Sequence, residues 1–199
     1  PCNDRKPVGL DTGPASVLMD AWIKHHQNLE YDDAGSWALS GEVDQHLLSL
    51  LLDEPYFDLP APKSTGREFL NPDWLARKLD MLSSTPKSED TQATLLEFTA
   101  ETICREILRL AQSGELIICG GGARNTALIR LLGQKLPNFK VLASTDFGVH
   151  ADCLEAYAFA WLARKTLQGE SVDFSPFTGA RHPVIAGGIY RSEKSGVSR

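Results

Sequence analysis

The chain has 199 residues, 42% of them hydrophobic and 23% charged, with a formal net charge of −6. This length and composition predict one globular domain, or one and a half, with a substantial buried core. The acidic balance without a basic stripe argues against a nucleic-acid partner, and no apolar run reaches the roughly 18 residues that a membrane span needs. Without a charged-then-apolar leader in these residues, the cytoplasm is the expected location.

Turn-forming residues open the chain. The segment 1–6 lacks an initiator methionine and resembles the second half of a hairpin turn, so we expect the chain to be part of a longer protein. Residues 7–10 predict a strand that enters a turn at Asp11, and apolar spacing predicts a helix over 15–27. A second amphipathic helix is expected over 34–52.

The middle of the chain alternates breaks and helices. A proline-rich stretch over 55–62 excludes regular helix, and a polar loop over 62–68 follows it. Asn71 is expected to cap a helix that runs to about Leu82. A linker then leads to Ser88, where acidic residues in the first turn open a long helix.

From Gly114, where the long helix should end, strands and helices alternate. Strands are expected at 116–119, 140–143 and 184–190, and helices at 125–136 and 151–167. This order predicts an α/β fold, with a parallel or mixed sheet flanked by helices. Residues 192–199 are polar and should form a tail.

The four cysteines predict neither a disulfide framework nor a zinc site. No CxxC pair occurs among Cys2, Cys104, Cys119 and Cys153. Two of the four lie in apolar patterns, so free, buried thiols in a reducing compartment are the expectation.

A single carboxylate, Asp11, stands where a short apolar run meets a Gly-Pro break. In doubly wound α/β proteins, ligands bind outside the carboxyl ends of strands, so Asp11 is a candidate site residue. Asp is also favoured in turns and at helix N-caps, so the alternative is that Asp11 only starts the turn and caps the following helix. Asp146 follows an expected strand in the same way and has the same two interpretations.

Three consecutive glycines, Gly120, Gly121 and Gly122, lie between an expected strand and an expected helix. Glycine lets backbone approach a ligand closely, and N–H groups at a helix start favour anions. The run is not a dinucleotide-binding fingerprint, because Asn125 stands where the third glycine should be, and it lacks the Gly-Lys-Ser/Thr of a Walker A loop. A nucleotide or phosphate site is therefore expected, with a tight turn needing positive φ as the alternative.

Three further groups are open to more than one interpretation. The loop from Lys63 to Arg67 can hold a sugar or phosphate, or can be docked onto a neighbouring helix by an Arg67 ion pair. Glu155, at the start of an apolar helix, either complements the helix dipole or faces a ligand. The His, Asp and Cys side chains over 150–153 match no usual ligand spacing, so no metal site is assigned.

Several of these pieces form an ordered series that spans the chain from about Val8 to Tyr190. In order, they are Asp11-Thr12-Gly13-Pro14, Leu18-Met19-Asp20-Ala21-Trp22, Pro62-Lys63-Ser64-Thr65-Gly66-Arg67-Glu68, Gln92-Ala93-Thr94-Leu95, Cys119-Gly120-Gly121-Gly122-Ala123-Arg124-Asn125, Glu155-Ala156-Tyr157-Ala158-Phe159-Ala160-Trp161-Leu162-Ala163 and Thr178-Gly179-Ala180. This series resembles the anhydro-N-acetylmuramic acid kinase family. The loop over 62–68 and the order of the motifs are specific, whereas each glycine motif alone is not.

The resemblance implies that residues 1–191 are the C-terminal lobe of a two-lobed sugar kinase of the Hsp70 and actin superfamily, with a ribonuclease-H-like (actin-like ATPase) fold. It implies an enzyme of peptidoglycan recycling that opens the 1,6-anhydro ring of anhydro-N-acetylmuramic acid with water and phosphorylates O6, which gives N-acetylmuramic acid 6-phosphate. ATP and Mg²⁺ are the implied cofactors, and a homodimer is the implied state of the intact enzyme.

By position, the resemblance implies that Asp11 is the catalytic base, that Glu155 contacts the amino sugar, and that Gly13 lies in a phosphate-contacting turn. The residues that match the family's adenosine-side motif are Gly120, Gly121, Gly122 and Asn125. The family usually continues Gly-Pro-Gly-Asn where Ala15 and Ser16 stand here. Its first phosphate loop, Gly-Thr-Ser-x-Asp-Gly, does not occur in these residues.

The missing loop keeps a second hypothesis open. The chain as given would then be a catalytically silent half-molecule that acts as a nucleotide- or sugar-binding module or a dimerisation module, with a sheet edge left uncovered. A Rossmann-type dinucleotide binder ranks last, because the fingerprint is incomplete.

Overall fold

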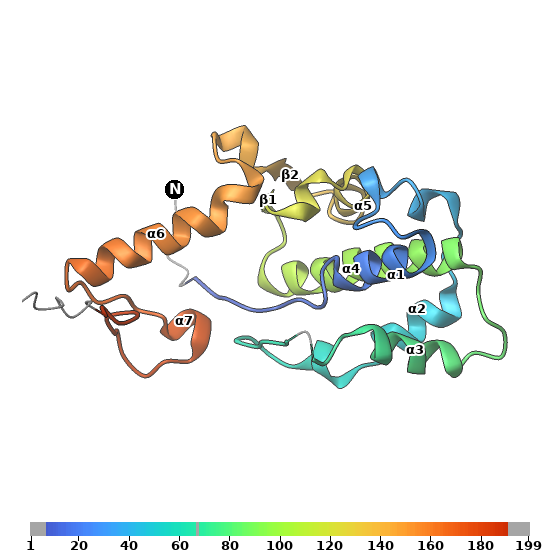
Figure 1. The fold of residues 1–199 in the computed structure, drawn as a ribbon, viewed down its shortest axis with the longest axis horizontal. Coiled ribbons are helices and arrows are strands. Elements are labelled where there is room, and N and C mark those ends of the chain that lie inside the picture. The colour runs from blue at the N-terminus through green and yellow to red at the C-terminus, as the bar shows by residue number, and fades with distance from the viewer. Residues whose placement is uncertain (1–6, 67, 191–199) are drawn as a thin grey trace, which may run out of the picture. The chain divides into compact units, whose positions relative to one another are not determined.

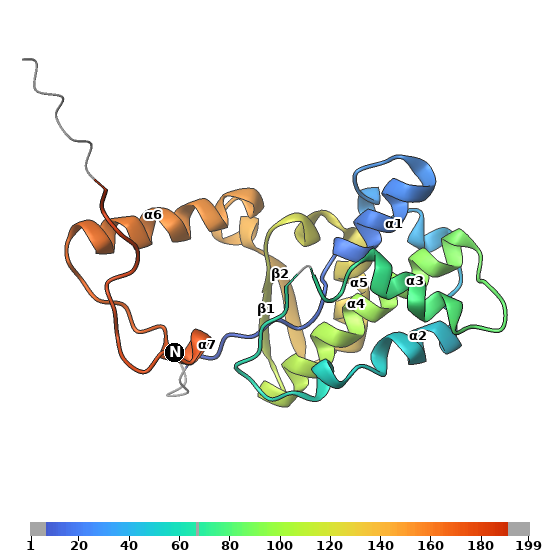
Figure 2. The same cartoon turned by 60° about the horizontal axis from the view of Figure 1, so that its bottom comes forward.

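The computed structural model describes residues 7–66 and 68–190, and the chain divides into two compact units (Figure 1 and Figure 2). The larger unit runs from Leu10 to Leu154, and the smaller one combines, of the described residues, 7–9 with 155–190. The expected turn in segment 1–6, the Arg67 side chain and the tail over 192–199 lie outside the described residues.

The long helix α4 (Ser88–Leu110) is the centre of the larger unit. Helices α1 (Val17–Gln27) and α2 (Gln45–Leu52) both pack against it, and α3 (Pro72–Asp80) packs against α1 and α2 (Figure 1). The helix α5 (Thr126–Lys135) also contacts α4. Each helix buries one apolar face against its neighbours, as the spacing of apolar residues at three and four positions predicts.

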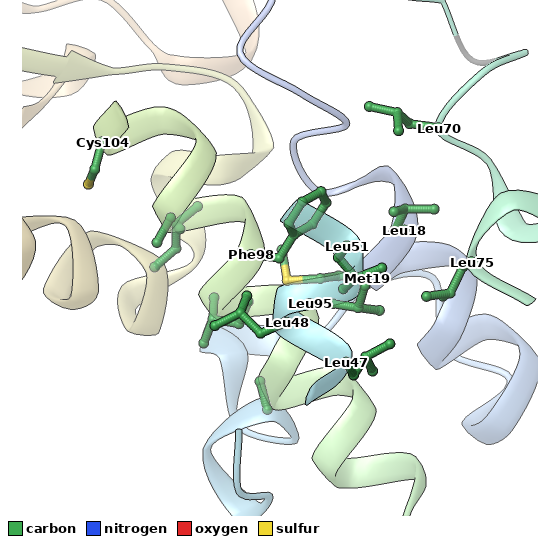
Figure 3. Packing of buried hydrophobic residues seen from close by; sticks show 14 of the residues in the cluster. Leu18, Met19, Leu47, Leu48, Leu51, Leu70, Leu75, Leu95, Phe98 and Cys104 are labelled. Carbon is green, nitrogen blue, oxygen red and sulfur yellow. The ribbon is translucent and has the colours of Figure 1, made fainter. Parts of the chain in front are cut away.

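Figure 3 shows the core where these helices meet. Met19 of α1, Leu51 of α2 and Phe98 of α4 are turned toward one another and are almost fully buried. The buried apolar side chains that α1, α2, α3 and α4 contribute include Leu18, Met19, Leu47, Leu48, Leu51, Trp74, Leu75, Leu95, Leu96 and Phe98. This single cluster extends to Leu128 and Leu132 of α5, so the helices and the sheet region share one core.

Local capping signals place several helix ends where the sequence predicts them. The Asn71 side chain accepts a hydrogen bond from the Trp74 backbone N–H at 2.9 Å, and Pro72 takes the first position of α3. The expected helices over 15–27 and from Ser88 are confirmed as α1 and α4. The helix α4 ends at Leu110, and Gly114 begins the next strand instead of ending the helix.

The sheet of the larger unit consists, within the described residues, of two parallel strands. Strand β1 (Gly114–Ile118) pairs with β2 (Phe139–Ala143), and α5 connects them (Figure 2). The predicted α/β order of strand, glycine turn, helix and strand is confirmed. The strand β1 is less buried than its apolar sequence predicts, since Ile117 is 48% exposed and none of its five residues is fully buried.

The expected helix over 34–52 is wrong in its first half. The chain there forms two short 3-10 turns, η1 (Asp33–Gly35) and η2 (Ala38–Ser40), before α2 begins. Gly35 has φ +73°, which interrupts a right-handed helix. A Cβ on Gly41 would lie 2.1 Å from the backbone oxygen of Glu89, so the chain crosses α4 too closely for a continuous helix.

The strands expected at 7–10 and 184–190 are also wrong, since neither segment forms a ladder in the described residues. Val184 pairs only with Val172, in one isolated antiparallel bridge. The Gly9 N–H donates to the Pro176 oxygen at 3.2 Å, within the smaller unit. Apolar sequence favours a strand, but a strand forms only where a neighbour satisfies its backbone groups.

The smaller unit contains most of α6 (Leu154–Leu167) and the short helix α7 (Ser175–Thr178). A 3-10 turn, η6 (Ala151–Cys153), precedes α6, so the helix expected over 151–167 starts three residues late. Although α6 is apolar in sequence, none of its residues is buried, and Phe159 is 70% exposed. Within residues 7–66 and 68–190, no helix combines the length and the apolar character needed to span a bilayer.

Candidate active site

Asp11 lies at a cavity of about 210 Å³ in the larger unit. Its lining residues are Asp11, Gly13, Pro14, Val17, Thr65, Gly66 and Leu70. The Asp11 Oδ2 atom accepts hydrogen bonds from the Ser64 hydroxyl at 2.7 Å and from the Thr65 backbone N–H at 2.9 Å. The interpretation of Asp11 as the cap of the next helix is wrong, because the N-cap position of α1 is Ser16.

The backbone of Asp11 is held from two sides. Its N–H donates to the Lys63 oxygen at 2.9 Å, and its own carbonyl accepts the Tyr56 hydroxyl at 2.8 Å. Burial raises the pKa of Tyr56, and the charges of Asp11 and Glu106 raise it further, so the tyrosine keeps its proton and remains a donor. The turn that carries Asp11 is therefore fixed at main-chain and side-chain atoms together.

The loop beside Asp11 is docked on α4 by a buried ion pair. The Lys63 Nζ atom lies 2.8 Å from Glu106 Oε1, and the two side chains are only 3% and 7% exposed. Glu106 also pairs with Arg109 at 2.7 Å. The loop is thus docked on a neighbouring helix through Lys63, whereas the ion pair expected of Arg67 stays a prediction, because Arg67 lies outside the described residues.

Gly13 and Ala15 pack closely under the same turn. A Cβ on Gly13 would lie 3.2 Å from Thr102 Oγ1 and 3.4 Å from the Phe57 ring, so packing alone gives a reason for glycine there. Ala15 has φ +49°, in the left-handed region that glycine occupies at no steric cost. Its carbonyl accepts the Thr99 hydroxyl at 3.0 Å, which holds the turn in this conformation.

The glycine turn between β1 and α5 is more open than a tight turn requires. Gly120 has φ +68°, and its N–H donates to the Ala151 oxygen at 3.1 Å. A Cβ on Gly120 or Gly121 would meet no atom within 4 Å, and one on Gly122 would make only ordinary contacts. Positive φ accounts for the first glycine, whereas neither conformation nor packing accounts for the other two.

A second cavity, of about 220 Å³, borders the glycine turn in the same unit. Its walls come from the glycine turn, the start of α1 and the segment 30–34, and they include Ser16, Asp20, Glu30, Asp33, Gly121, Gly122, Arg124 and Asn125. Burial raises the pKa of Asp20, the Ser16 hydroxyl opposes this shift, and the charge of Asp32 adds to it. Carboxylates in such a wall accept hydrogen bonds from hydroxyl and amino groups and repel phosphate.

Asn125 has a structural role that explains its presence without a ligand. Its side chain caps α5 by accepting the Leu128 backbone N–H at 3.0 Å. Gly35 fits against it, since a Cβ there would lie 2.7 Å from Asn125 Oδ1 and 2.6 Å from the Cβ of Ala127. The segment around Gly35 thus packs directly on the start of α5.

The remaining candidate residues are Glu155, Asp146 and Asp152. Glu155 is exposed in the first turn of α6 and belongs to the smaller unit, whereas Asp11 belongs to the larger one. Asp146 accepts the Ala143 backbone N–H at 3.0 Å, which confirms its turn interpretation. Asp152 forms an ion pair with Arg124, and no group of three metal-ligating side chains gathers in the described part of the chain.

Three described cysteines carry free thiols, as expected, but only Cys104 is buried. Burial raises the pKa of the Cys104 thiol to about 11. Cys119 is exposed and Cys153 is half-buried, which corrects the expectation of buried thiols. Cys2 lies outside the described residues.

Sequence reasoning did not single out Tyr56 or Glu106, although both hold the Asp11 turn. One signal for Glu106 was available. It follows Thr99 and Thr102 at helical spacing on the buried face of α4, and a charge in that register requires a partner of opposite charge. Tyr56 gave no such signal, because the residues around it in the proline-rich segment do not distinguish a tyrosine that holds a turn from one that only fills the core.

Comparison with known proteins agrees with the motif series. The family model described as anhydro-N-acetylmuramic acid kinase matches residues 2–192. Proteins of that name are 48% identical over 183 residues in Sulfurovum sp. (strain NBC37-1) and 42% identical over 193 residues in Shewanella oneidensis. These alignments cover 92% and 97% of this chain, but 50% and 52% of the relatives.

A third relative of the same name, from Saccharophagus degradans, is 44% identical over 183 residues, which cover 92% of this chain and 49% of that protein. The chain therefore spans about half the length of the curated relatives that it matches. Because the family model covers nearly the whole chain, this chain belongs to the anhydro-N-acetylmuramic acid kinase family.

Proposed function

We propose that the protein containing this chain is an ATP-dependent kinase that opens the 1,6-anhydro ring of anhydro-N-acetylmuramic acid with water and phosphorylates O6. The product would be N-acetylmuramic acid 6-phosphate, in cell-wall recycling. Family membership supports the reaction class. The observation that carries the proposal is the Asp11 carboxylate, held at a cavity with one oxygen engaged by Ser64 and Thr65.

Within this proposal, residues 1–191 are the C-terminal lobe of a two-lobed kinase with a ribonuclease-H-like fold, and 192–199 are a tail. The half-length match to the relatives supports a second lobe elsewhere in the intact protein. The parallel β1–α5–β2 unit is compatible with such a lobe. The intact enzyme is proposed to be a cytoplasmic homodimer.

Asp11 is the proposed general base, and Glu155 the proposed contact to the amino sugar. A carboxylate on a turn that is fixed at both backbone groups can take a proton from a water held at a defined position. Phosphoryl transfer then needs mainly alignment of the acceptor oxygen and neutralisation of charge on the phosphates. Gly13, at the same cavity, is proposed to lie beside the transferred phosphate.

The glycine turn is proposed to receive the nucleoside part of ATP, with Asn125 beside it. A Cβ would meet no atom within 4 Å at Gly121 and would make only ordinary contacts at Gly122. The backbone of these two glycines is therefore open to a ligand. The acidic wall of the adjoining cavity suits ribose hydroxyls and an amino group better than phosphates. Mg²⁺ would accompany ATP, and no residue of this chain is assigned to it, because the described residues gather no ligand group for it.

The Asp11→Asn variant of the full-length protein tests the base. Loss of a general base lowers kcat by roughly a hundred- to ten-thousandfold. The matched control is Asp80→Asn, at the exposed end of α3, which should keep wild-type turnover. Formation of the 6-phosphate at a near wild-type rate by Asp11→Asn would refute the assignment.

Two substitutions of Asn125 separate nucleotide binding from capping. Asn125→Asp keeps an N-cap acceptor but removes the amide donor, whereas Asn125→Ala removes both. If the amide binds ATP, both variants weaken ATP affinity, and only the alanine variant loses about 1 kcal/mol of stability. Unchanged ATP affinity in Asn125→Asp would leave Asn125 with its cap alone.

The exposed apolar side chains favour one second candidate, a silent half-molecule that binds or dimerises. Ile117 on β1 is half-exposed, and on α6 the exposed aromatic residues are Tyr157, Phe159 and Trp161. This candidate predicts weak or no MgATP binding by the 199-residue chain, together with self-association at micromolar concentration. Tight MgATP binding in a calorimetric titration of that chain, with a monomeric sedimentation profile, would exclude it.

A further inference from the structure

The loop after Lys63 makes three hydrogen bonds to one residue, Asp11. The Lys63 oxygen accepts the Asp11 N–H at 2.9 Å, the Ser64 hydroxyl donates to Asp11 Oδ2 at 2.7 Å, and the Thr65 N–H donates to the same oxygen at 2.9 Å. Donors on a carboxylate oxygen are charge-assisted and directional. Because both side-chain contacts go to Oδ2, the loop fixes the orientation of the carboxylate, and within residues 7–66 and 68–190 no hydrogen bond to Oδ1 is found.

The loop that presents Ser64 is itself rigidly attached. The preceding residue, Lys63, is buried, with its Nζ 2.8 Å from Glu106 Oε1 and 3.3 Å from the oxygens of Tyr56 and Phe57. The same Nζ lies 5.0 Å from the centre of the Tyr56 ring, whose hydroxyl donates to the Asp11 oxygen. A buried cation with four such contacts allows little movement of the residue next to it.

We propose that Ser64 is a positioning residue that holds Asp11 Oδ2 and thereby aims Asp11 Oδ1 at the water that opens the anhydro ring. The proposal rests on the proposed function. In the step concerned, the water oxygen bonds to C1 of the sugar as the C1–O6 bond breaks, and the water proton passes to Asp11 Oδ1. The released O6 bonds to the γ-phosphorus of ATP, the bond to the β-phosphate oxygen breaks, and ADP leaves.

This role separates Ser64 from residues that bind substrate. A misdirected base slows the chemical step. It leaves the affinities for sugar and ATP unchanged, because the contacts that bind the ground state are still made. Loss of one hydrogen bond to a charged group corresponds to roughly a ten- to hundredfold loss of kcat. The Thr65 N–H remains on Oδ2 in such a variant, so the loss stays well below that of Asp11→Asn.

The test compares Ser64→Ala, Ser64→Thr and the control Ser49→Ala in the full-length kinase, with kcat and both KM values measured. Ser49 is exposed on α2, away from the Asp11 cavity. We expect Ser64→Ala to lose roughly ten- to hundredfold in kcat with both KM values unchanged. Ser64→Thr keeps the hydroxyl and should recover most of kcat, and Ser49→Ala should match the wild type.

The outcomes separate the role of Ser64 from the proposed function of the enzyme. If the wild type forms the 6-phosphate and Ser64→Ala does so equally fast, the positioning role of Ser64 is refuted while the proposed function stands. A rise of KM at unchanged kcat would make Ser64 a binding residue and also refute the role. If the wild type forms no 6-phosphate from the anhydro sugar and MgATP, the proposed function fails, and the role of Ser64 falls with it.

Discussion

The buried pair of Lys63 and Glu106 should respond unequally to the loss of either partner. In Lys63→Met the Glu106 carboxylate keeps a charged partner, because Arg109 Nη1 lies 2.7 Å from Oε1. In Glu106→Leu the partners that the described part of the chain leaves to the Lys63 ammonium are neutral, namely the oxygens of Tyr56 and Phe57 at 3.3 Å. A buried charge without a counter-charge is the costly state, so we expect the glutamate substitution to be the more damaging one.

The magnitudes follow from that difference. Removing one partner of a fully buried pair costs about 3–5 kcal/mol, which we expect for Glu106→Leu. Because Arg109 still neutralises Glu106 in Lys63→Met, the cost there should be that of one lost charged hydrogen bond, about 1.5–3 kcal/mol. In the double variant no buried charge is left unpaired, so its free energy of unfolding should fall by less than that of Glu106→Leu alone.

Urea unfolding at neutral pH, followed by tryptophan fluorescence, measures these costs. Three of the four tryptophans, Trp22, Trp37 and Trp74, lie in the larger unit with the ion pair. The control is Lys24→Met, whose exposed pair with Glu30 should change stability by less than about 1 kcal/mol. Equal losses for the two single variants, or a double variant that equals their sum, would refute the reasoning.

Three further predictions concern single residues. Ala15→Gly should stabilise the chain by about 0.5–1 kcal/mol, because relief of about 1–2 kcal/mol of left-handed strain exceeds the roughly 0.4–1 kcal/mol of unfolded-state freedom that glycine adds, and an unchanged urea midpoint would contradict the strain. Cys104, with a pKa of about 11, is only about one part in a thousand thiolate at pH 8, so iodoacetamide should label exposed Cys119 first and Cys104 only on unfolding, as mass spectrometry of labelled peptides can show. Burial raises the pKa of Asp20 in the folded state, so the stability linked to its proton is present below the unfolded pKa of about 3.9 and is lost as pH rises through the folded pKa. Asp20→Asn should therefore stabilise the protein at pH 7, with a gain that shrinks toward pH 4 in urea titrations, and a gain that is independent of pH would contradict the shift.

The elements that the sequence predicts correctly depend on nearby residues. Asn71 caps α3 through the backbone three residues on, and the apolar spacing of α4 is visible along the helix itself. The failures depend on distant residues. Gly41 interrupts the expected helix because it crosses the backbone at Glu89, and the strand expected over 184–190 lacks a neighbour beyond the bridge at Val184. Local patterns record propensity, whereas these contacts are set by tertiary packing.

The candidate site likewise combines local features, which the sequence predicts, with contacts between distant residues, which it does not predict. Asp11 and the glycine turn could be located, because turns and glycine runs are local signals. The partners of Asp11 could not, because Ser64 lies 53 residues away along the chain. The ion pair that docks the loop joins residues separated by 43 positions, and only the register of Glu106 on α4 hinted at it.

The buried face of α4 contacts the Asp11 turn and the loop beside it. Successive residues at helical spacing on that face, Thr99, Thr102 and Glu106, meet the turn in order: the Thr99 hydroxyl holds the Ala15 oxygen, Thr102 packs against Gly13, and Glu106 binds the loop through Lys63. The Thr99 hydroxyl donates both to the Ala15 oxygen and to the Leu95 oxygen of its own helix, whereas the Thr102 hydroxyl donates to the Thr99 oxygen and touches the turn by packing alone. The helix therefore contacts the Asp11 turn and the loop beside it at three successive positions. These contacts hold the backbone on both sides of Ala15, and strain of the kind that a positive φ imposes on alanine persists where the surrounding structure holds the residue in this way.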